Sequence, residues 1–260
     1  YTTGLKEGQL IIVAGRPGIG KTVVATNLAT NISINSKKTV ALFNLEMGAE
    51  QLINRMIASV GGIDQHKLQT GYFNESDWNK FTKATAELSN SKIYFDDTPS
   101  LSIGELKSKC RKLASSEDGL DVIIIDYLQI LNSNKNYQGN RQQEVADISR
   151  SLKQLALELK VPIIALAQLR RPIEQKKGDQ RPTMNELRES GQIEQDADII
   201  VLLYREDYVD KTKAIDNNTT IMEFNLEKNR NGVAGRKIEL LYNKNLSRLL
   251  NKGKEINETN

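Results

Sequence analysis

A run of residues near the start of the chain has the types and spacing of a phosphate-binding loop. It fits the pattern G-x-x-x-x-G-K-[ST] and consists of Gly15, Arg16, Pro17, Gly18, Ile19, Gly20, Lys21 and Thr22. Glycines allow a tight turn that aims several backbone N–H groups at one anion, and the following helix N-terminus adds its positive end. In this pattern Lys21 reaches the β- and γ-phosphates, and the Thr22 hydroxyl binds Mg²⁺. The sequence therefore predicts a nucleoside triphosphate site, because a full match between a strand and a helix disfavours an ordinary glycine-rich turn.

Polar residues also follow three other apolar runs, and these residues are Glu46, Asp126 and Gln168. Ligands of open α/β sheets bind beyond the carboxyl ends of the strands, so these side chains are expected to converge on the loop. We expect Glu46 to orient and partly deprotonate an attacking water. Asp126 is expected to hold Mg²⁺ together with Thr22, and Gln168 to sense the γ-phosphate. Taken singly, each has a structural alternative: an acid at a strand end often caps the next helix, and a glutamine there is often only polar.

The cation that stabilises a phosphoryl-transfer transition state is not evident close to the loop. Arg16 lies inside the loop and is free to point outward. Such an arginine is often supplied by another subunit. The best candidates are Arg230 and Lys228, at the tip of an expected hairpin, and a simple basic turn is the alternative.

A polar segment, residues 187–198, lies between apolar runs and is the candidate DNA-binding segment. Arg188 is expected to contact a phosphate, and the Ser190 and Gly191 amides are free to donate. Aromatic residues make up only 5% of the chain, which disfavours base stacking. A single strand held here would be gripped by its backbone without sequence preference. A solvated helix start is the alternative reading of this segment.

Hydrophobic periodicity predicts an α/β fold with a mostly parallel sheet, helices on both faces and an antiparallel hairpin at one edge. The expected strands are residues 10–14, 38–45, 92–96, 121–126, 161–167 and 197–204, and the expected hairpin joins 219–227 to 236–242. The expected helices are residues 22–34, 49–60, 102–113 and 141–160, with a helical pair within 63–91. Residues 131–140, 170–186 and 206–218 are expected to be loops.

Composition narrows the class of protein. The 260 residues include 36 Lys and Arg against 33 Asp and Glu, so the net charge of +3 is too small for a surface-wide field for nucleic acid. One cysteine, Cys110, excludes an internal disulfide framework and suits a reducing compartment. No apolar run approaches the ~20 residues that cross a bilayer, so no membrane partner is expected. The chain begins at Tyr1, and we expect it to be a fragment or processed piece with a domain missing upstream.

With these motifs in place, the chain closely resembles the ATPase domain of DnaB-type replicative DNA helicases. The resemblance runs from about residue 4 to 245. It rests on the phosphate-binding loop, Asn44-Leu45-Glu46-Met47, Asp96-Asp97-Thr98-Pro99, Ile125-Asp126-Tyr127-Leu128-Gln129, Asn140-Arg141-Gln142-Gln143-Glu144-Val145, Gln168-Leu169, residues 188–198 and residues 228–232. Gly15 and Gly18 stand where the family often has Ala and Ser, and Arg170-Arg171 stands where a Ser-Arg pair is common.

The resemblance implies a RecA-like domain that forms a hexameric ring around single-stranded DNA, binds ATP and Mg²⁺ between neighbouring subunits, and moves 5′ to 3′. It makes Glu46 the catalytic base and directs Arg230, with Lys228, to the neighbour's ATP. Arg188, Glu189 and Gly191 fall where the family's DNA-contacting loop lies. It further implies primase and a helicase loader as partners, and a nucleoid or a plastid as location. Residues 1–250 form the ATPase domain and 251–260 a polar tail, and the family's N-terminal collar domain and linker helix are expected to be absent from this chain.

Other classes of protein remain as alternatives at this point. One is a RecA-fold ATPase that forms rings or filaments without unwinding DNA, and residues 188–198 argue against it. Another is a small-molecule kinase with Glu46 as its base, but no acceptor site is evident. The last is a non-catalytic, nucleotide-gated interaction module, which an intact Glu46 and Asp126 oppose.

Overall fold

The computed structural model describes all residues except 1, 134–136, 138, 171–179 and 253–260, and it describes only the backbone of 188–190. Its strands are β1 (Leu10–Gly15), β2 (Val40–Asn44), β3 (Ile93–Asp96), β4 (Val122–Asp126), β5 (Ile163–Gln168), β6 (Ile199–Tyr204), β7 (Thr219–Asn229), β8 (Arg236–Asn243) and β9 (Arg248–Asn251). Its helices are α1 (Lys21–Thr30), α2 (Ala49–Gly61), α3 (Gln65–Thr70), α4 (Glu75–Ser89), α5 (Ile103–Ala114), α6 (Arg141–Leu159), α7 (Gly191–Asp196) and α8 (Glu206–Val209).

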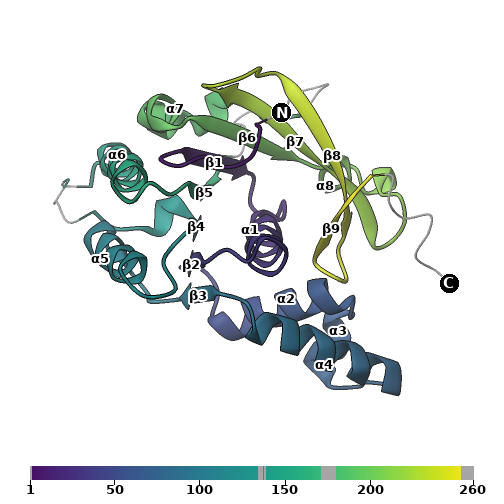
Figure 1. Ribbon diagram of the computed structural model, residues 1–260. Coiled ribbons are helices and arrows are strands. Elements are labelled where there is room, and N and C mark those ends of the chain that lie inside the picture. The colour runs from purple at the N-terminus through teal and green to yellow at the C-terminus, as the bar shows by residue number, and fades with distance from the viewer. Residues whose placement is uncertain (1, 134–136, 138, 171–179, 253–260) are drawn as a thin grey trace.

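One sheet organises the described residues, in the strand order β3-β2-β4-β5-β1-β6-β7-β8-β9 (Figure 1). The strands from β3 to β6 in this order run parallel. The central strands β4 and β1 are buried along their whole length, which is why they read as continuous apolar, β-branched runs. The predicted α/β class and mostly parallel sheet are therefore confirmed.

The antiparallel end of the sheet is larger than the predicted hairpin. β7 pairs with β6 and with β8 in antiparallel register, which confirms the hairpin. A further strand, β9, pairs with β8 and was not predicted, since its four residues are too few to show a pattern. The prediction of one helix over residues 22–34 was wrong at its end, because α1 is followed by a π-helical turn at Asn31–Asn35. The expected loop at 206–218 also contains the short helix α8.

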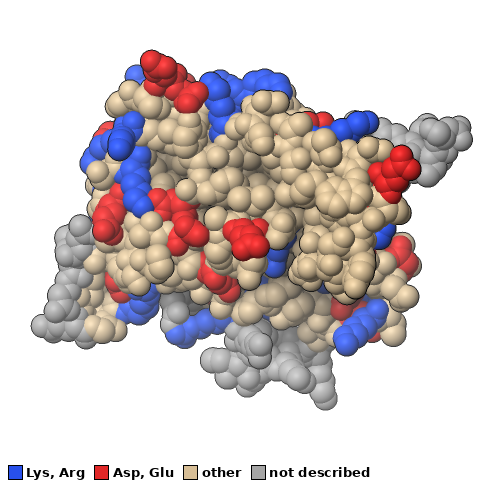
Figure 2. Space-filling view, turned by 90° about the horizontal axis from the view of Figure 1, so that it is seen from below, with Lys and Arg blue, Asp and Glu red and all other residues tan. Residues whose placement is uncertain are grey.

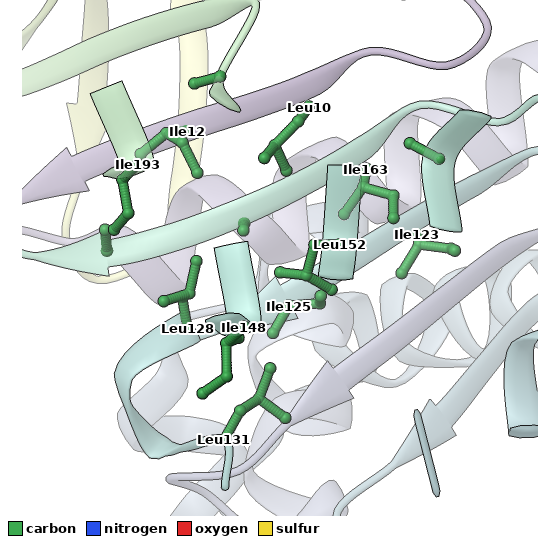
Figure 3. Packing of buried hydrophobic residues seen from close by; sticks show 14 of the residues in the cluster. Leu10, Ile12, Ile123, Ile125, Leu128, Leu131, Ile148, Leu152, Ile163 and Ile193 are labelled. Carbon is green, nitrogen blue, oxygen red and sulfur yellow. The ribbon is translucent and has the colours of Figure 1, made fainter. Parts of the chain in front are cut away.

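The helices cover both faces of the sheet, as predicted (Figure 1). Helices α5, α6 and α7 pack on one face, and α1 and α2 on the other, with α3 and α4 carried outward on α2. Figure 3 shows how Ile148 and Leu152 of α6 face Ile12, Ile125 and Ile163 of neighbouring strands. No helix within the described residues combines the length and apolar composition that would span a bilayer.

This packing gives a test of the fold within one helix. Leu152 of α6 is fully buried, whereas Leu157 on the same helix is 58% exposed. We expect Leu152→Ala to lower the free energy of unfolding by about 2–5 kcal/mol, because it removes buried methyl groups and leaves a cavity. Leu157→Ala, the matched control, should change it by only about 0.5 kcal/mol. Urea denaturation measures both values, and equal losses would contradict this packing.

Candidate nucleotide-binding site

The carboxyl ends of the parallel strands bring the predicted residues together. In the sheet register Gly15 lies opposite Gln168, and Asn44 lies opposite Asp126. A cavity of about 340 Å³ opens at this edge, and its lining includes Gly20, Lys21, Thr22, Glu46, Arg55 and Gln168. The convergence expected from the strand ends is therefore present in one site.

The backbone of the phosphate-binding loop is arranged to receive an anion. Gly18 and Gly20 adopt positive φ angles of 74° and 112°, which side-chain-bearing residues rarely adopt. The Tyr208 hydroxyl donates to the Pro17 carbonyl at 2.8 Å, and Arg205 donates to the Ile19 carbonyl at 3.1 Å. These donors hold loop carbonyl groups, while the N–H groups of Gly18 and Gly20 meet no acceptor among the described residues. The loop thus leaves donors for a phosphate.

Lys21 is buried at the floor of this loop. Its Nζ donates to the carbonyl oxygens of Gly15 and Arg16 at 3.2 and 3.3 Å. Burial lowers the pKa of Lys21, and the nearby carboxylates of Asp126 and Glu46 oppose that shift. An anionic phosphate in the cavity would favour the charged lysine, as the motif predicts.

Asp126 is the least satisfied charged group of the site. It is 1% exposed, and neither carboxylate oxygen has a hydrogen-bond partner among the described residues. Burial raises the pKa of Asp126, while the Thr22 hydroxyl and the Lys21 charge act in the opposite direction. A hard divalent cation would compensate this buried charge, so the donor set fits Mg²⁺. The described residues contain no cluster of three or more metal-binding side chains, so phosphates and water would complete the coordination.

Glu46 differs from Asp126 because it is exposed to the cavity. The Asn44 side chain fixes its backbone, since Asn44 Oδ1 accepts from the N–H groups of Glu46 and Met47 at 3.0 and 2.9 Å. The Leu45 N–H donates to the Asp126 carbonyl at 2.9 Å. Glu46 is therefore held at a defined position while its carboxylate stays accessible to water.

Arg55 is a cavity residue that sequence reasoning missed. It lies on α2, the helix that follows Glu46, and forms no hydrogen bond or ion pair with any residue that the structure describes. Its charge acts on Asp126, where it lowers the carboxyl pKa. The available signal was its position on the first helix after the strand that delivers Glu46.

Arg16 points away from this cavity and toward a different element. Its guanidinium pairs with Glu186 at 3.2 Å, and both side chains are almost fully buried. Glu186 belongs to the 3-10 turn Met184–Ser190, which leads into α7. The pair therefore connects the phosphate-binding loop to the start of the candidate DNA-binding segment.

The structure describes only part of that segment. The side chains of Arg188 and Glu189 lie outside the described residues, as does Arg171. Gly191 begins α7, is exposed, and has open space where a Cβ atom would lie. A backbone could therefore approach Gly191 closely.

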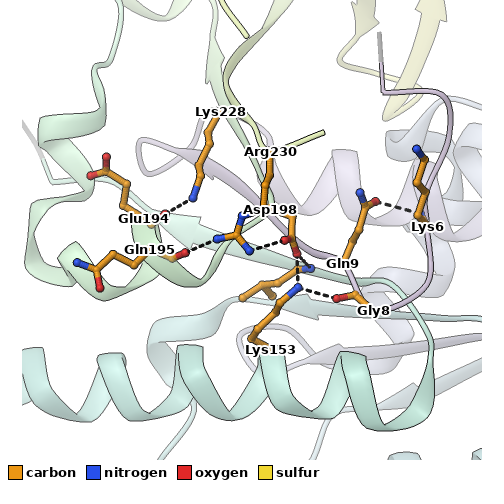
Figure 4. A network of polar contacts seen from close by, with 10 residues as sticks. Lys6, Gly8, Gln9, Lys153, Glu194, Gln195, Asp198, Lys228 and Arg230 are labelled. Atoms are coloured by element: carbon orange, nitrogen blue, oxygen red, sulfur yellow. Dashed lines mark hydrogen bonds and ion pairs between the residues drawn. The ribbon is translucent and has the colours of Figure 1, made fainter. Parts of the chain in front are cut away.

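Arg230 and Lys228 lie at the opposite edge of the sheet from the phosphate-binding loop. Lys228 pairs with Ile200 at the amino end of β6, and its Nζ donates to the Glu194 carbonyl at 2.6 Å. Arg230 donates to Asp198 Oδ1 at 2.9 Å and to a main-chain carbonyl of α7 at 2.8 Å (Figure 4). The two cations therefore cannot reach the nucleotide cavity of their own chain.

The charges on the face in Figure 2 are mixed. Lys and Arg side chains form small groups among Asp and Glu, and a broad area carries neither. This agrees with the net charge of +3. On this face, attraction for a nucleic acid would have to come from local groups.

Fold and site together define a RecA-like P-loop ATPase domain, and solved structures agree. A solved structure of an isolated ATPase domain matches with a TM-score of 0.89 at 39% identity, over 96% of this chain and 87% of that chain. A DnaB-like replicative helicase, described with its interactions with primase, matches with a TM-score of 0.88 at 38% identity, over 96% of this chain and 59% of that one.

The sequence comparisons identify the family. The model of the DnaB-like helicase C terminal domain matches residues 1–251, and this chain belongs to that family. Replicative DNA helicase DnaC of Bacillus subtilis (strain 168) is 48% identical over 250 residues, which are 96% of this chain and 54% of the relative. Replicative DNA helicase DnaB of Geobacillus stearothermophilus is 46% identical over 257 residues, which are 99% and 55%. The chain spans about half the length of these curated relatives.

The unpaired carboxylate of Asp126 gives a prediction with a defined sign. Its pKa is raised above the ordinary 3.8, so ionisation destabilises the folded chain as pH rises from that value toward the folded-state pKa. A buried group without a partner costs about 1–3 kcal/mol. We therefore expect Asp126→Asn to raise the nucleotide-free melting temperature by several degrees at neutral pH, and the gain should vanish at pH below about 4.

Two further measurements complete this test. Mg²⁺ with ATP should stabilise the wild type but not the variant. The control is Asp121→Asn, at the amino end of the same chain segment, where the carboxylate accepts from Lys38 and Thr39 at 2.9 and 2.8 Å. Asp121→Asn should bring no gain. A lower melting temperature for nucleotide-free Asp126→Asn would contradict an unpaired buried charge.

Proposed function

We propose that this chain is the motor domain of an ATP-dependent replicative DNA helicase. In this proposal it hydrolyses ATP at the subunit interfaces of a hexameric ring and moves along single-stranded DNA, 5′ to 3′, to unwind duplex at the replication fork. The observation that carries the proposal is the division of the site between two sheet edges. Phosphate, metal and base groups converge at one edge, whereas Arg230 lies at the other.

Within one chain, the cavity residues bind and activate the nucleotide. Lys21 and the loop amides would hold the phosphates, and Thr22 with Asp126 would hold Mg²⁺. Bound Mg²⁺ neutralises charge that develops on the transferred phosphoryl group. Exposed Glu46 would orient the attacking water and accept its proton. Gln168, which lines the same cavity, would bind the γ-phosphate.

The neighbouring chain would complete the site. Arg230 and Lys228 are the proposed cations that act on the neighbour's ATP, because they are remote from their own cavity. Arg55, which has no partner among the described residues, is proposed to face the phosphates from within the chain. A complete site would then exist only where two chains meet, as in a closed ring.

The segment around Gly191 is proposed to contact DNA, together with Arg188 and Glu189. The open approach to Gly191 and the Arg16–Glu186 pair support this, because they connect an accessible backbone to the phosphate-binding loop. Primase and a helicase loader are proposed partners, and a relative of known structure is described with its interactions with primase. Location in a bacterial nucleoid or a plastid stays a prediction.

The first experiment measures ATP hydrolysis with and without single-stranded DNA while light scattering records the mass in solution. The proposal expects stimulation by DNA together with a hexamer-sized species, and strand displacement in a forked-duplex assay. A ring with DNA-stimulated hydrolysis but no displacement would support an ATPase that does not unwind. A monomer that hydrolyses ATP well without DNA would overturn the shared-site proposal.

Arg230→Ala tests the contribution in trans. We expect turnover to fall by about 10³–10⁵, the range for a transition-state arginine, while nucleotide affinity stays nearly unchanged. Arg236→Ala is the control, since Arg236 is an exposed arginine on the adjacent strand. Normal turnover in Arg230→Ala would reject the assignment.

Mixing variants separates a shared site from loss of folding. Lys21→Ala should be inactive because it lacks its own phosphate contact. A mixture of Lys21→Ala and Arg230→Ala chains should regain turnover that neither shows alone. At some interfaces an intact phosphate-binding loop then faces an intact arginine. Absence of any gain in rings of confirmed mixed composition would place Arg230 outside the site.

A further inference from the structure

The side chain of Gln129 continues the sheet where two strands separate. β4 and β5 pair in parallel register as far as Ile125 and Ala165. At the end of β5, the N–H of Gln168 donates to Gln129 Oε1 at 3.1 Å. Gln129 Nε2 in turn donates to the Gln168 carbonyl at 3.0 Å. One side-chain amide thus takes both backbone hydrogen bonds that a neighbouring strand would otherwise take.

The main chain of Gln168 is consequently held from two sides. On the other side it lies opposite Gly15, and the Leu169 N–H donates to the Gly15 carbonyl at 3.1 Å. Gly15 begins the phosphate-binding loop, and Gln129 follows Asp126 by three residues. The cavity glutamine is therefore placed between the loop that binds phosphate and the segment that binds metal.

Gln129 itself has a fixed support. It lies in the 3-10 turn Leu128–Ile130, and Leu128 is fully buried in the core. Arg141, in the first turn of α6, donates to the carbonyl oxygens of Gln129 and Leu131. Arg141 also pairs with Glu144. These contacts use two motifs of the sequence analysis whose residues, Asp126 apart, have no role in the proposed function.

We propose that Gln129 is a positioning residue, which fixes the main chain of Gln168 so that the Gln168 amide meets the third phosphate of ATP. The inference rests on the proposed role of Gln168. A glutamine is required because its amide offers both an acceptor and a donor. A carboxylate at this position would set an oxygen against the Gln168 carbonyl, and an alanine would leave both backbone groups without this partner.

The test compares affinity for ADP with affinity for a non-hydrolysable ATP analogue in the 260-residue chain. The variants are Gln129→Glu and Gln129→Ala, with Gln168→Ala as the reference. Gln142→Ala is the control, because Gln142 is an exposed glutamine nearby on α6. We expect ADP affinity to stay within about twofold, while preference for the analogue falls about 10-fold in both Gln129 variants, the size of one or two lost hydrogen bonds.

A pH series separates positioning from a general loss of stability. As pH falls, the introduced carboxyl of Gln129→Glu becomes protonated and can again donate to the Gln168 carbonyl. Relative to wild type at each pH, Gln129→Glu should regain preference for the analogue, and Gln129→Ala should not. A purely structural role would lower the melting temperature of both variants without changing the preference.

The outcomes distinguish the two proposals. If Gln168→Ala loses the preference and the Gln129 variants keep it, the inference about Gln129 is wrong and the proposed function stands. If Gln168→Ala keeps the preference, the assigned role of Gln168 fails and the inference falls with it. Loss in Gln168→Ala and both Gln129 variants, with recovery at low pH in Gln129→Glu alone, supports the inference.

Discussion

A carboxylate buried without a partner, at the end of one of the most buried strands, is the constraint around which the site is built. Asp126 lies where β4 leaves the core, and removing its charge from water costs free energy that the nucleotide-free chain does not recover. Nearby Lys21 is also buried, and its charge only partly compensates. The sheet sustains this arrangement because its apolar strands are packed on both faces. A cation and a phosphate would therefore enter a cavity that is already shaped and already electrostatically incomplete.

The sheet also separates the groups that would act together. Parallel strands bring all their carboxyl ends to one edge, and an antiparallel β7 must carry its own end to the other. Arg230 therefore lies at the far edge from Gly15 in the same chain. Strand direction alone makes an intramolecular arginine unworkable. Association of chains is the geometric means of bringing the two edges into contact.

The sequence was sufficient for the fold class and for the convergence at the strand ends. Burial on both faces produces unbroken apolar runs, and such runs give both the strand and the point where it delivers a residue such as Asp126 or Gln168. It was insufficient where a side chain acts across elements. Arg55 faces the cavity because of how α2 packs, Arg16 pairs with a residue 170 positions later, and Gln129 replaces a strand. These contacts depend on tertiary distances that no local pattern contains.

The network in Figure 4 bears on how freely the remote arginine can move. Asp198 accepts not only from Arg230 but also from Lys153 Nζ at 2.6 Å and from the N–H of Leu10 at 2.8 Å. The carboxylate would thus keep a cation and an amide if Arg230 left it. Departure of the guanidinium exposes no uncompensated charge, so the arginine behaves as an exchangeable partner on a permanent mount. Because Leu10 begins the strand that ends in the phosphate-binding loop, the same mount gives both ends of β1 a shared mechanical reference.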